Sequence, residues 1–285
     1  MARRKDSGHI INLEDYRENG FELPKSFDDL EDSFGDLNAE KSDDLLFKAY
    51  DANTKAQAIK YAKEALKLNP NNIDAENVII EYEDDSIKRL EMRKEVLKKA
   101  ENKLKKDGYF DKEYIGDFYL ILETRPYMRT LHSYTLNLVE LGRYTEAIKM
   151  AETMLTLCKS DNTGIRYLLI VLYVFLEKYK ECDKLLKKFH EVDSMVVFPE
   201  AIMYYKKGEY DKCIDTLKVL HKSNKHIIKM LIEDSDDATN INYYASGSRE
   251  EASIAINTSF LLLASTPLFV EFVDKHKTEI RSTKK

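Results

Sequence analysis

Three segments of the chain repeat one pattern, and their spacing constrains the fold more than any other feature of the sequence. They read GRYTEAI at residues 142–148, EKYKEC at 177–182 and GEYDKCI at 208–214. Their tyrosines, Tyr144, Tyr179 and Tyr210, lie 35 and then 31 residues apart, close to the period of about 34 residues of a helix–turn–helix repeat. Apolar stretches of helical composition precede the segments at 131–141, 165–176 and 200–206. The pattern therefore predicts successive antiparallel helix pairs.

Each position in the pattern has its own structural role. A glycine such as Gly142 or Gly208 can end the first helix, because it adopts the left-handed conformation that a helix end requires. The tyrosine packs in the turn, and a small residue three positions later lets the two helices approach closely. The small residues are Ala147, Cys182, Cys213 and, in an earlier hairpin that ends before Pro70, Ala58. We therefore expect an all-α protein, a right-handed superhelix of antiparallel helical hairpins like that of tetratricopeptide repeats (TPR).

Composition excludes several other classes. Glycine and proline number only 9 and 5, which argues against a sheet protein with many tight turns. The three cysteines are widely spaced and odd in number, so they favour neither a disulfide framework nor a zinc site. We interpret Cys182 and Cys213 as packed structural thiols and predict no metal and no cofactor. No apolar stretch is long enough to span a bilayer, and no apolar leader follows the first residues, so we expect a cytoplasmic protein without membrane binding.

Charge divides the chain into parts. Residues 14–44 contain twelve acidic and three basic residues, a balance of −9, so the net charge of −6 leaves +3 for the rest. We expect a flexible acidic N-terminal segment at 1–41, a TPR-like helical-repeat domain at 42–277 and a basic tail at 278–285. A further hypothesis is that residues 13–34 occupy the concave groove of the repeats until a partner displaces them.

Three local expectations follow from shorter patterns. Asp111 is expected to cap a helix that directs Tyr114, Phe118 and Leu122 inward. The lysine-rich stretch at 88–106 has interleaved glutamates, which is typical of a solvated helix face, and it lacks the aromatic residues that stack on bases, so nucleic-acid binding is not expected. Helices at 249–264, opened by a capping box at Ser248, and at 267–276 are expected to cap the solenoid.

Three further strings carry a family resemblance: ETRPYMR at 123–129, DNTGIRYLL at 161–169 and YASGSREEA at 244–252. With the repeats, they resemble TPR-like helical-repeat proteins related to the suppressor of tumorigenicity seven group and their bacterial counterparts, over roughly residues 50–275. The resemblance implies a helical-repeat fold and a role in protein interaction. It implies no activity, cofactor or catalytic residue, and this chain lacks the cysteines of the zinc module that some bacterial relatives append.

The most informative polar residues lie near the starts of two successive first helices. They are Glu123, Arg125, Tyr127, Arg129, Asp161, Asn162 and Arg166. The repeat register brings these helix starts side by side, which predicts a network of arginines and carboxylates. In one interpretation Glu123, Asp161 and Asn162 belong to a structural network in which Asp161 or Asn162 caps the next helix. In the other, the arginines bind a carboxylate or phosphate, because the guanidinium group is a planar fork that fits both.

The first helices of TPR pairs line the concave surface of the superhelix. This places Arg129, His132, Leu136, Tyr167 and Val171 on that surface. His132 and Leu136, four residues apart, share one helical face and can hold an extended peptide through one polar and one apolar contact. The predicted binding residues are Arg125, Arg129, His132, Leu136, Arg166 and Tyr167.

No catalytic pattern accompanies these residues. The six histidines are scattered, and the chain contains no HExxH, no GxSxG and no phosphate-cradling glycine loop. We therefore predict a non-enzymatic intracellular adaptor or scaffold that binds another protein or peptide segment through its concave face. Two alternatives stay open: a ligand-sensing regulator that binds a small anion or short peptide at an arginine-lined pocket, and an enzyme of unknown chemistry.

Overall fold

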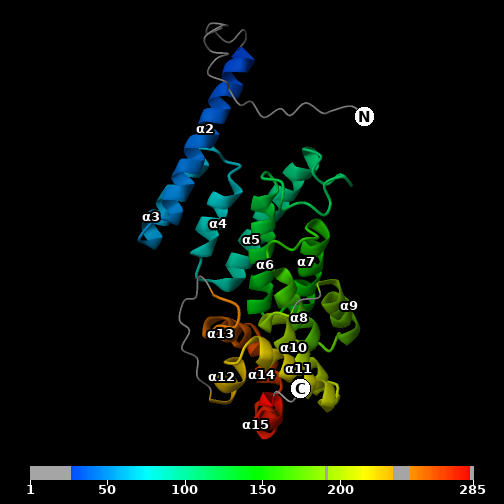
Figure 1. The fold of residues 1–285 in the computed structure, drawn as a ribbon. Helices are drawn as coiled ribbons and strands as arrows, with labels where there is room; N and C mark the ends of the chain where they lie inside the picture. The colour runs from blue at the N-terminus through cyan, green and yellow to red at the C-terminus, as the bar shows by residue number, and fades with distance from the viewer. Residues whose placement is uncertain (1–26, 190–191, 234–243, 283–285) are drawn as a thin grey trace, which may run out of the picture. The chain divides into compact units, whose positions relative to one another are not determined.

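The computed structural model describes residues 27–189, 192–233 and 244–282, with side chains from residue 37 onward. Regular secondary structure in these ranges is helical, from α2 to α15 (Figure 1). This confirms the expected all-α class for the described part of the chain. None of the described helices combines the length and apolar character that crossing a membrane requires. The flexibility expected of residues 1–26, and most of the segment expected in the groove, lie outside the described residues.

The helices form two compact units, Met1–Glu83 and Asp84–Lys285, where the sequence predicted one repeat domain. The first unit contains α2 (Phe27–Tyr50), α3 (Lys55–Leu68) and α4 (Ile73–Glu81). Helix α2 runs through the expected boundary at residue 41. Helix formation is cooperative. Once packing holds one end of a helix, each further residue loses its backbone conformational freedom but gains one backbone hydrogen bond.

Small side chains build the core of the first unit. Its buried members on the first two helices are Leu46, Ala49, Ala58, Ala62 and Ala65. The Ser42 hydroxyl of α2 donates to the Ala65 carbonyl of α3 at 3.0 Å, and the Asn72 amide donates to the Ser42 oxygen at 2.9 Å. Ser42 therefore marks where α3 ends and α4 begins along α2, and the alanines allow close contact between α2 and α3.

The second unit contains the three repeated segments. Its helices are α5 (Ser86–Lys106), α6 (Arg125–Glu140), α7 (Tyr144–Leu157), α8 (Ile165–Phe175), α9 (Tyr179–Phe189), α10 (Ser194–Lys206), α11 (Tyr210–Ser223), α12 (Ile227–Glu233), α13 (Arg249–Thr258), α14 (Phe260–Ser265) and α15 (Leu268–Arg281). Helices α6 and α7, α8 and α9, and α10 and α11 pack as pairs, and α8 also packs against α10 (Figure 1). Each pair is joined by the turn of one repeated segment.

The three turns share one backbone geometry. Gly142, Glu177 and Gly208 have φ of 71°, 58° and 74°, all in the left-handed region. In each turn, the N–H of the following residue donates to the carbonyl that lies five residues before that residue. These bonds are Arg143 to Leu138 at 2.7 Å, Lys178 to Tyr173 at 2.8 Å and Glu209 to Tyr204 at 2.9 Å. This is the Schellman motif, which satisfies carbonyls that a helix end leaves without partners.

The small residue of each pattern is fully buried on the second helix of its pair. Ala147, Cys182 and Cys213 each have 0% of their surface exposed. Burial raises the pKa of both the Cys182 and the Cys213 thiol to about 12. A thiol with so high a pKa stays protonated and is a poor nucleophile. The interpretation of these two cysteines as packed structural residues is therefore confirmed.

The expected helix after Asp111 is absent from the structure. Residues 107–124 form turns, and Leu122, expected to face inward, is 68% exposed. Gly116, with φ of 116°, donates its N–H to the Leu157 carbonyl and accepts from the Lys159 N–H, at 3.0 and 2.8 Å. Backbone groups used in this way are not available to a helix. Phe118 is buried as expected, through bonds to the end of α7 rather than through a helix face.

The C-terminal helices, which were expected to cap the solenoid, pack against several helices of the repeated pairs. Helix α15 packs against α11 and α12 and extends to Arg281, into the expected basic tail. Helix α13 packs against α8 and α10, and α14 packs against α8 (Figure 1). The expected single helix at 249–264 is divided at Ser259 into α13 and α14. The C-terminal segment therefore covers part of the surface that the first helices of the pairs present.

The Glu177 turn provides a test of this backbone geometry. We expect Glu177→Gly to raise the free energy of unfolding by about 0.5 kcal/mol. The left-handed conformation costs a residue with a side chain about 1–2 kcal/mol, which glycine avoids. Part of this gain is lost because glycine also has more conformational freedom in the unfolded chain. The substitution also removes the ion pair between Glu177 and Lys206, at 3.6 Å. Because the Glu177 carboxylate is exposed, this pair contributes little to stability. Urea denaturation followed by circular dichroism measures the change.

The converse substitution is Gly142→Ala, where an added Cβ meets no atom within 4 Å. Its expected loss of about 1 kcal/mol therefore reports the backbone conformation alone. Equal stability of both variants and the parent would contradict the left-handed assignment.

Candidate functional site

The first helix of the first repeated pair, α6, has one stripe that its neighbours leave accessible. Residues at spacings of three and four, Arg125, Arg129, His132 and Leu136, share this helical face. Arg129 and Leu136 are exposed, Leu136 to 44%, and the other two are half-buried. Helix α5 packs on one side of the stripe and α7 on another. Four of the six predicted binding residues therefore form one continuous surface, which we call the α6 stripe.

Arg125, at the beginning of the stripe, is used by the preceding turn. Its Nε donates to the Tyr119 carbonyl at 2.9 Å, and its guanidinium lies 5.7 Å from the centre of the Tyr119 ring. These contacts hold the turn before α6 against the helix start.

Asp161 occupies the start of α8 and is the centre of the predicted network. Its carboxylate accepts the N–H of Ile165 at 2.9 Å and of Arg166 at 3.1 Å, and the Arg166 Nη1 at 2.9 Å. The Asp161 side chain is 1% exposed and that of Arg166 is 13% exposed. The two N–H groups are among those a helix start leaves without partners, and the dipole there favours negative charge. Asp161 therefore supplies the side-chain acceptor for the first N–H groups of α8, which begins after Gly164.

Arg166 and Tyr167 extend this network to the next pair. Arg166 Nη2 donates to the Tyr167 hydroxyl at 2.7 Å, and that hydroxyl donates to Asp193 at 3.2 Å. Asp193 in turn caps α10 by accepting the Met195 N–H at 2.7 Å. The Arg166 guanidinium also lies 4.2 Å from the centre of the Tyr167 ring. Arg166 and Tyr167 therefore join the starts of α8 and α10.

The other two residues assigned to the network have different positions. Asn162 is exposed, and its Oδ1 accepts from the Ser160 hydroxyl at 2.6 Å and from the Cys158 thiol at 3.3 Å. Glu123 is exposed on the turn before α6. Of the three predicted structural residues, Asp161 is thus the one that makes the buried arginine–carboxylate contact described above.

His132 connects the α6 stripe electrostatically to the start of α8. Burial lowers the pKa of His132 below its ordinary value of 6.5, and the nearby Asp161 charge opposes this shift. The imidazole is therefore neutral near pH 7 and can accept or donate one hydrogen bond.

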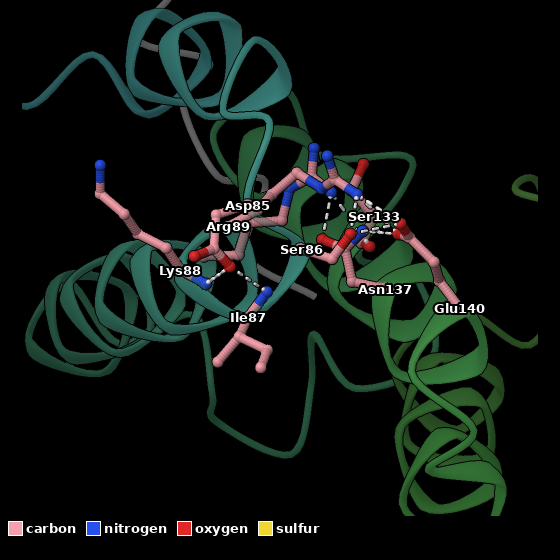
Figure 2. Close-up of polar contacts among 9 residues, drawn as sticks. Asp85, Ser86, Ile87, Lys88, Arg89, Ser133, Asn137 and Glu140 are labelled. Atoms are coloured by element: carbon pink, nitrogen blue, oxygen red, sulfur yellow. Dashed lines mark hydrogen bonds and ion pairs between the residues drawn. The ribbon is translucent and has the colours of Figure 1, made fainter.

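A second polar cluster joins α5 to α6 at the far end of the stripe. Figure 2 shows Ser86 and Arg89 of α5 reaching Glu140 of α6, with Asn137 beside it. Arg89 Nη2 lies 2.6 and 2.7 Å from the two Glu140 oxygens. Hydrogen bonds from Ser86 and then Arg89 lower the pKa of Glu140. The α6 stripe therefore ends at a carboxylate whose charge is already compensated.

Arg93 belongs to the same cluster and corrects the expectation of a solvated face at 88–106. It is 3% exposed, and its Nη1 donates to Asn137 at 2.5 Å and to the Ser133 carbonyl at 3.3 Å. The sequence signal was present, because Arg93 lies three residues after the buried Leu90 and three before the buried Val96, within the apolar face of α5. An arginine in such a face indicates a buried polar contact.

Val171 of α8 does not line an open surface. It is 2% exposed, and α8 is packed against α13 and α14 as well as α7, α9 and α10. Val171, which was expected on the binding surface, is therefore buried, whereas Arg129 and Leu136 of α6 are exposed. The sequence could not show how α8 is packed, because α13 and α14 come from a distant part of the chain.

Comparison with known proteins adds no assignment to this geometry. No protein-family model matches the sequence, and a search of curated proteins gives no significant match. Among the residues whose placement is described, no group of three or more histidine, cysteine or acidic side chains is arranged to hold a metal ion. The site is therefore interpreted from its own residues.

Removal of the Asp161 carboxylate tests the network. We expect Asp161→Ala to lower the free energy of unfolding by about 3 kcal/mol, because it leaves the largely buried Arg166 without this partner and removes the helix cap. Asp161→Asn should lose less, since its amide oxygen still accepts a hydrogen bond. The exposed neighbour offers the control Asn162→Ala, with an expected loss below about 1 kcal/mol. Comparable losses at both positions in urea denaturation would contradict the network.

The stability of the fold should be sensitive to acid because of the half-buried His132. Since the folded pKa of His132 lies below 6.5, the unfolded chain binds its proton more readily, and stability rises with pH across that interval. The contribution of neutral His132 to the free energy of unfolding is therefore intact above about pH 6.5, and it is lost as the pH falls below that value. His132→Gln should flatten the decline between pH 7.5 and 5.5 in urea titrations. A decline as steep as that of the parent protein would contradict the assignment.

Proposed function

We propose that this protein is an adaptor that binds a peptide segment of another protein along the α6 stripe, on a TPR-like stack of helical hairpins. The proposal rests on one observation above all: Arg129 and Leu136 remain exposed on a helix whose other faces are packed against α5 and α7. The packing of α8 against α10 supports the stacking of successive pairs, as do the three turns with one backbone geometry.

The side chains of the stripe suggest the chemistry of the ligand. Leu136 offers an apolar contact, the half-buried His132 offers one hydrogen bond, and Arg129 offers an exposed positive charge. An extended segment that combines an apolar side chain with a carboxylate some residues away complements this arrangement. The proposed adaptor role assigns no catalytic residue.

The alternative of an anion sensor has less support. A pocket shared by three arginines requires guanidinium groups that converge on one point. Arg125 donates to the turn before α6, and Arg166 donates to Asp161 and to the Tyr167 hydroxyl. Their observed contacts hold separate helix starts in place, so we favour a peptide on the stripe over a small anion between the arginines.

A charge placed in the stripe tests the proposal. Peptides selected from a displayed library on the full chain should contain an apolar residue near an acidic one. Leu136→Glu should weaken their binding at least tenfold in calorimetric titration, because it removes an apolar anchor and introduces repulsion, equivalent to about 1.4 kcal/mol or more. The fold should persist, since Leu136 is exposed.

The matched control is Val219→Glu on α11, where the parent side chain is 46% exposed, close to the 44% of Leu136. It should bind the selected peptides as the parent does. Selected peptides that bind Leu136→Glu as tightly as the parent would place the binding surface elsewhere and refute this proposal.

A further inference from the structure

Helix α2 continues beyond the two helices that pack against it in the first unit. It has 24 residues, whereas α3 has 14. The hydrogen bonds of Ser42 to Ala65 and from Asn72 place Ser42 near the end of α3 and the beginning of α4. At 1.5 Å per residue, residues 27–38 therefore extend roughly 17 Å past both helices, as the blue beginning of α2 shows in Figure 1. We call residues 27–40 the α2 extension.

The sequence of the α2 extension suits a helix that packs against a basic partner. Phe27, Leu30, Phe34 and Leu37 recur at spacings of three, four and three residues, which is the pattern of one apolar helix face. Leu37, whose side chain is described, is 43% exposed. The extension also contains six acidic residues and no basic residue, a net charge of −6. A helix with this pattern normally buries its apolar face against another element.

The outer face of α3 has the complementary chemistry. A shallow hollow of about 320 Å³ lies along it, lined by Ala56, Ile59, Lys60, Lys63, Glu64 and Lys67. The buried alanines of α3, by contrast, belong to the core that α3 forms with α2. The hollow therefore offers two apolar side chains flanked by three lysines and one glutamate, on the side of α3 away from its own α2.

We propose that the α2 extension of one copy packs into the α3 hollow of a second copy, so that the protein is a reciprocal homodimer. The same chain cannot make this contact, because its extension continues directly into the α2 residues packed on the opposite side of α3. Residues 1–26 are a poorer occupant, since their five basic and five acidic residues balance to zero. A two-fold axis makes both contacts equivalent and closes the assembly at two chains.

Charge reversal on each side tests the pairing. Sedimentation velocity of the full chain should give twice its mass of 33.2 kDa. The triple variant Lys60→Glu, Lys63→Glu, Lys67→Glu should be monomeric through repulsion from the acidic extension. The triple variant Asp29→Lys, Glu31→Lys, Glu40→Lys changes the acidic positions nearest the apolar face of the extension, and it should be monomeric for the converse reason. An equimolar mixture of the two should regain the dimer, because each reversed hollow then meets a reversed extension.

The controls separate this contact from a general effect of charge. Lys180→Glu, Lys184→Glu, Lys187→Glu reverses three exposed lysines at comparable spacing on α9, and this variant should remain dimeric. Circular dichroism should show unchanged helical content in all variants. Raising the salt concentration should weaken the parent dimer, because exposed charges are screened.

A measurement on the parent protein does not depend on any variant. Zero-length coupling of lysines to carboxylates, in a mixture of isotopically labelled and unlabelled chains, should join a peptide from residues 55–68 to one from 27–40 between different copies. A monomeric parent, a mixture of variants that stays monomeric, or couplings found within one copy alone would each overturn the proposal.

Discussion

The repeated pairs of the second unit depend on one constraint, namely that each first helix must end in a left-handed residue so that the second helix returns at close range. The return places a fixed position of the second helix at the crossing, and that position has no exposed surface in any of the three pairs. A side chain larger than alanine or cysteine would separate the helices there. The same constraint explains why two thiols lie in the core with raised pKa values.

Buried carboxylates at helix starts provide a second level of organisation, which links one pair to the next. Asp161 caps α8 and binds Arg166, and Tyr167 continues this chain to the cap of α10. Glu251 of α13, 4% exposed, accepts the Ser194 N–H of α10 at 3.3 Å and the Asn224 amide at 3.3 Å. Helix starts present unpaired N–H groups, so a single carboxylate there satisfies several donors at once. Asp161 and Glu251 lie in two of the three strings that the sequence analysis singled out, at 161–169 and 244–252.

The candidate site could be predicted in part. Helical spacing was enough to place Arg129, His132 and Leu136 on one face of α6, because that relation depends on the period of the helix alone. A local capping pattern likewise identified Asp161. Whether a face is open depends on helices distant in sequence, so the packing of α13 and α14 against α8, where Val171 is buried, had no local signal. The path of residues 107–124 was missed for a related reason, since Gly116 bonds to the backbone at the end of α7.

The sequence by itself determined the helical class, the positions of the three repeated turns and the small residues at the helix crossings. These follow from local preferences and from the period of the pattern, which act within a few tens of residues. Tertiary structure decided which stripe of the first helices stays exposed, which arginines are buried, and where the chain divides into two units. Those outcomes depend on contacts between distant segments, and such contacts bury or expose a residue irrespective of its local pattern.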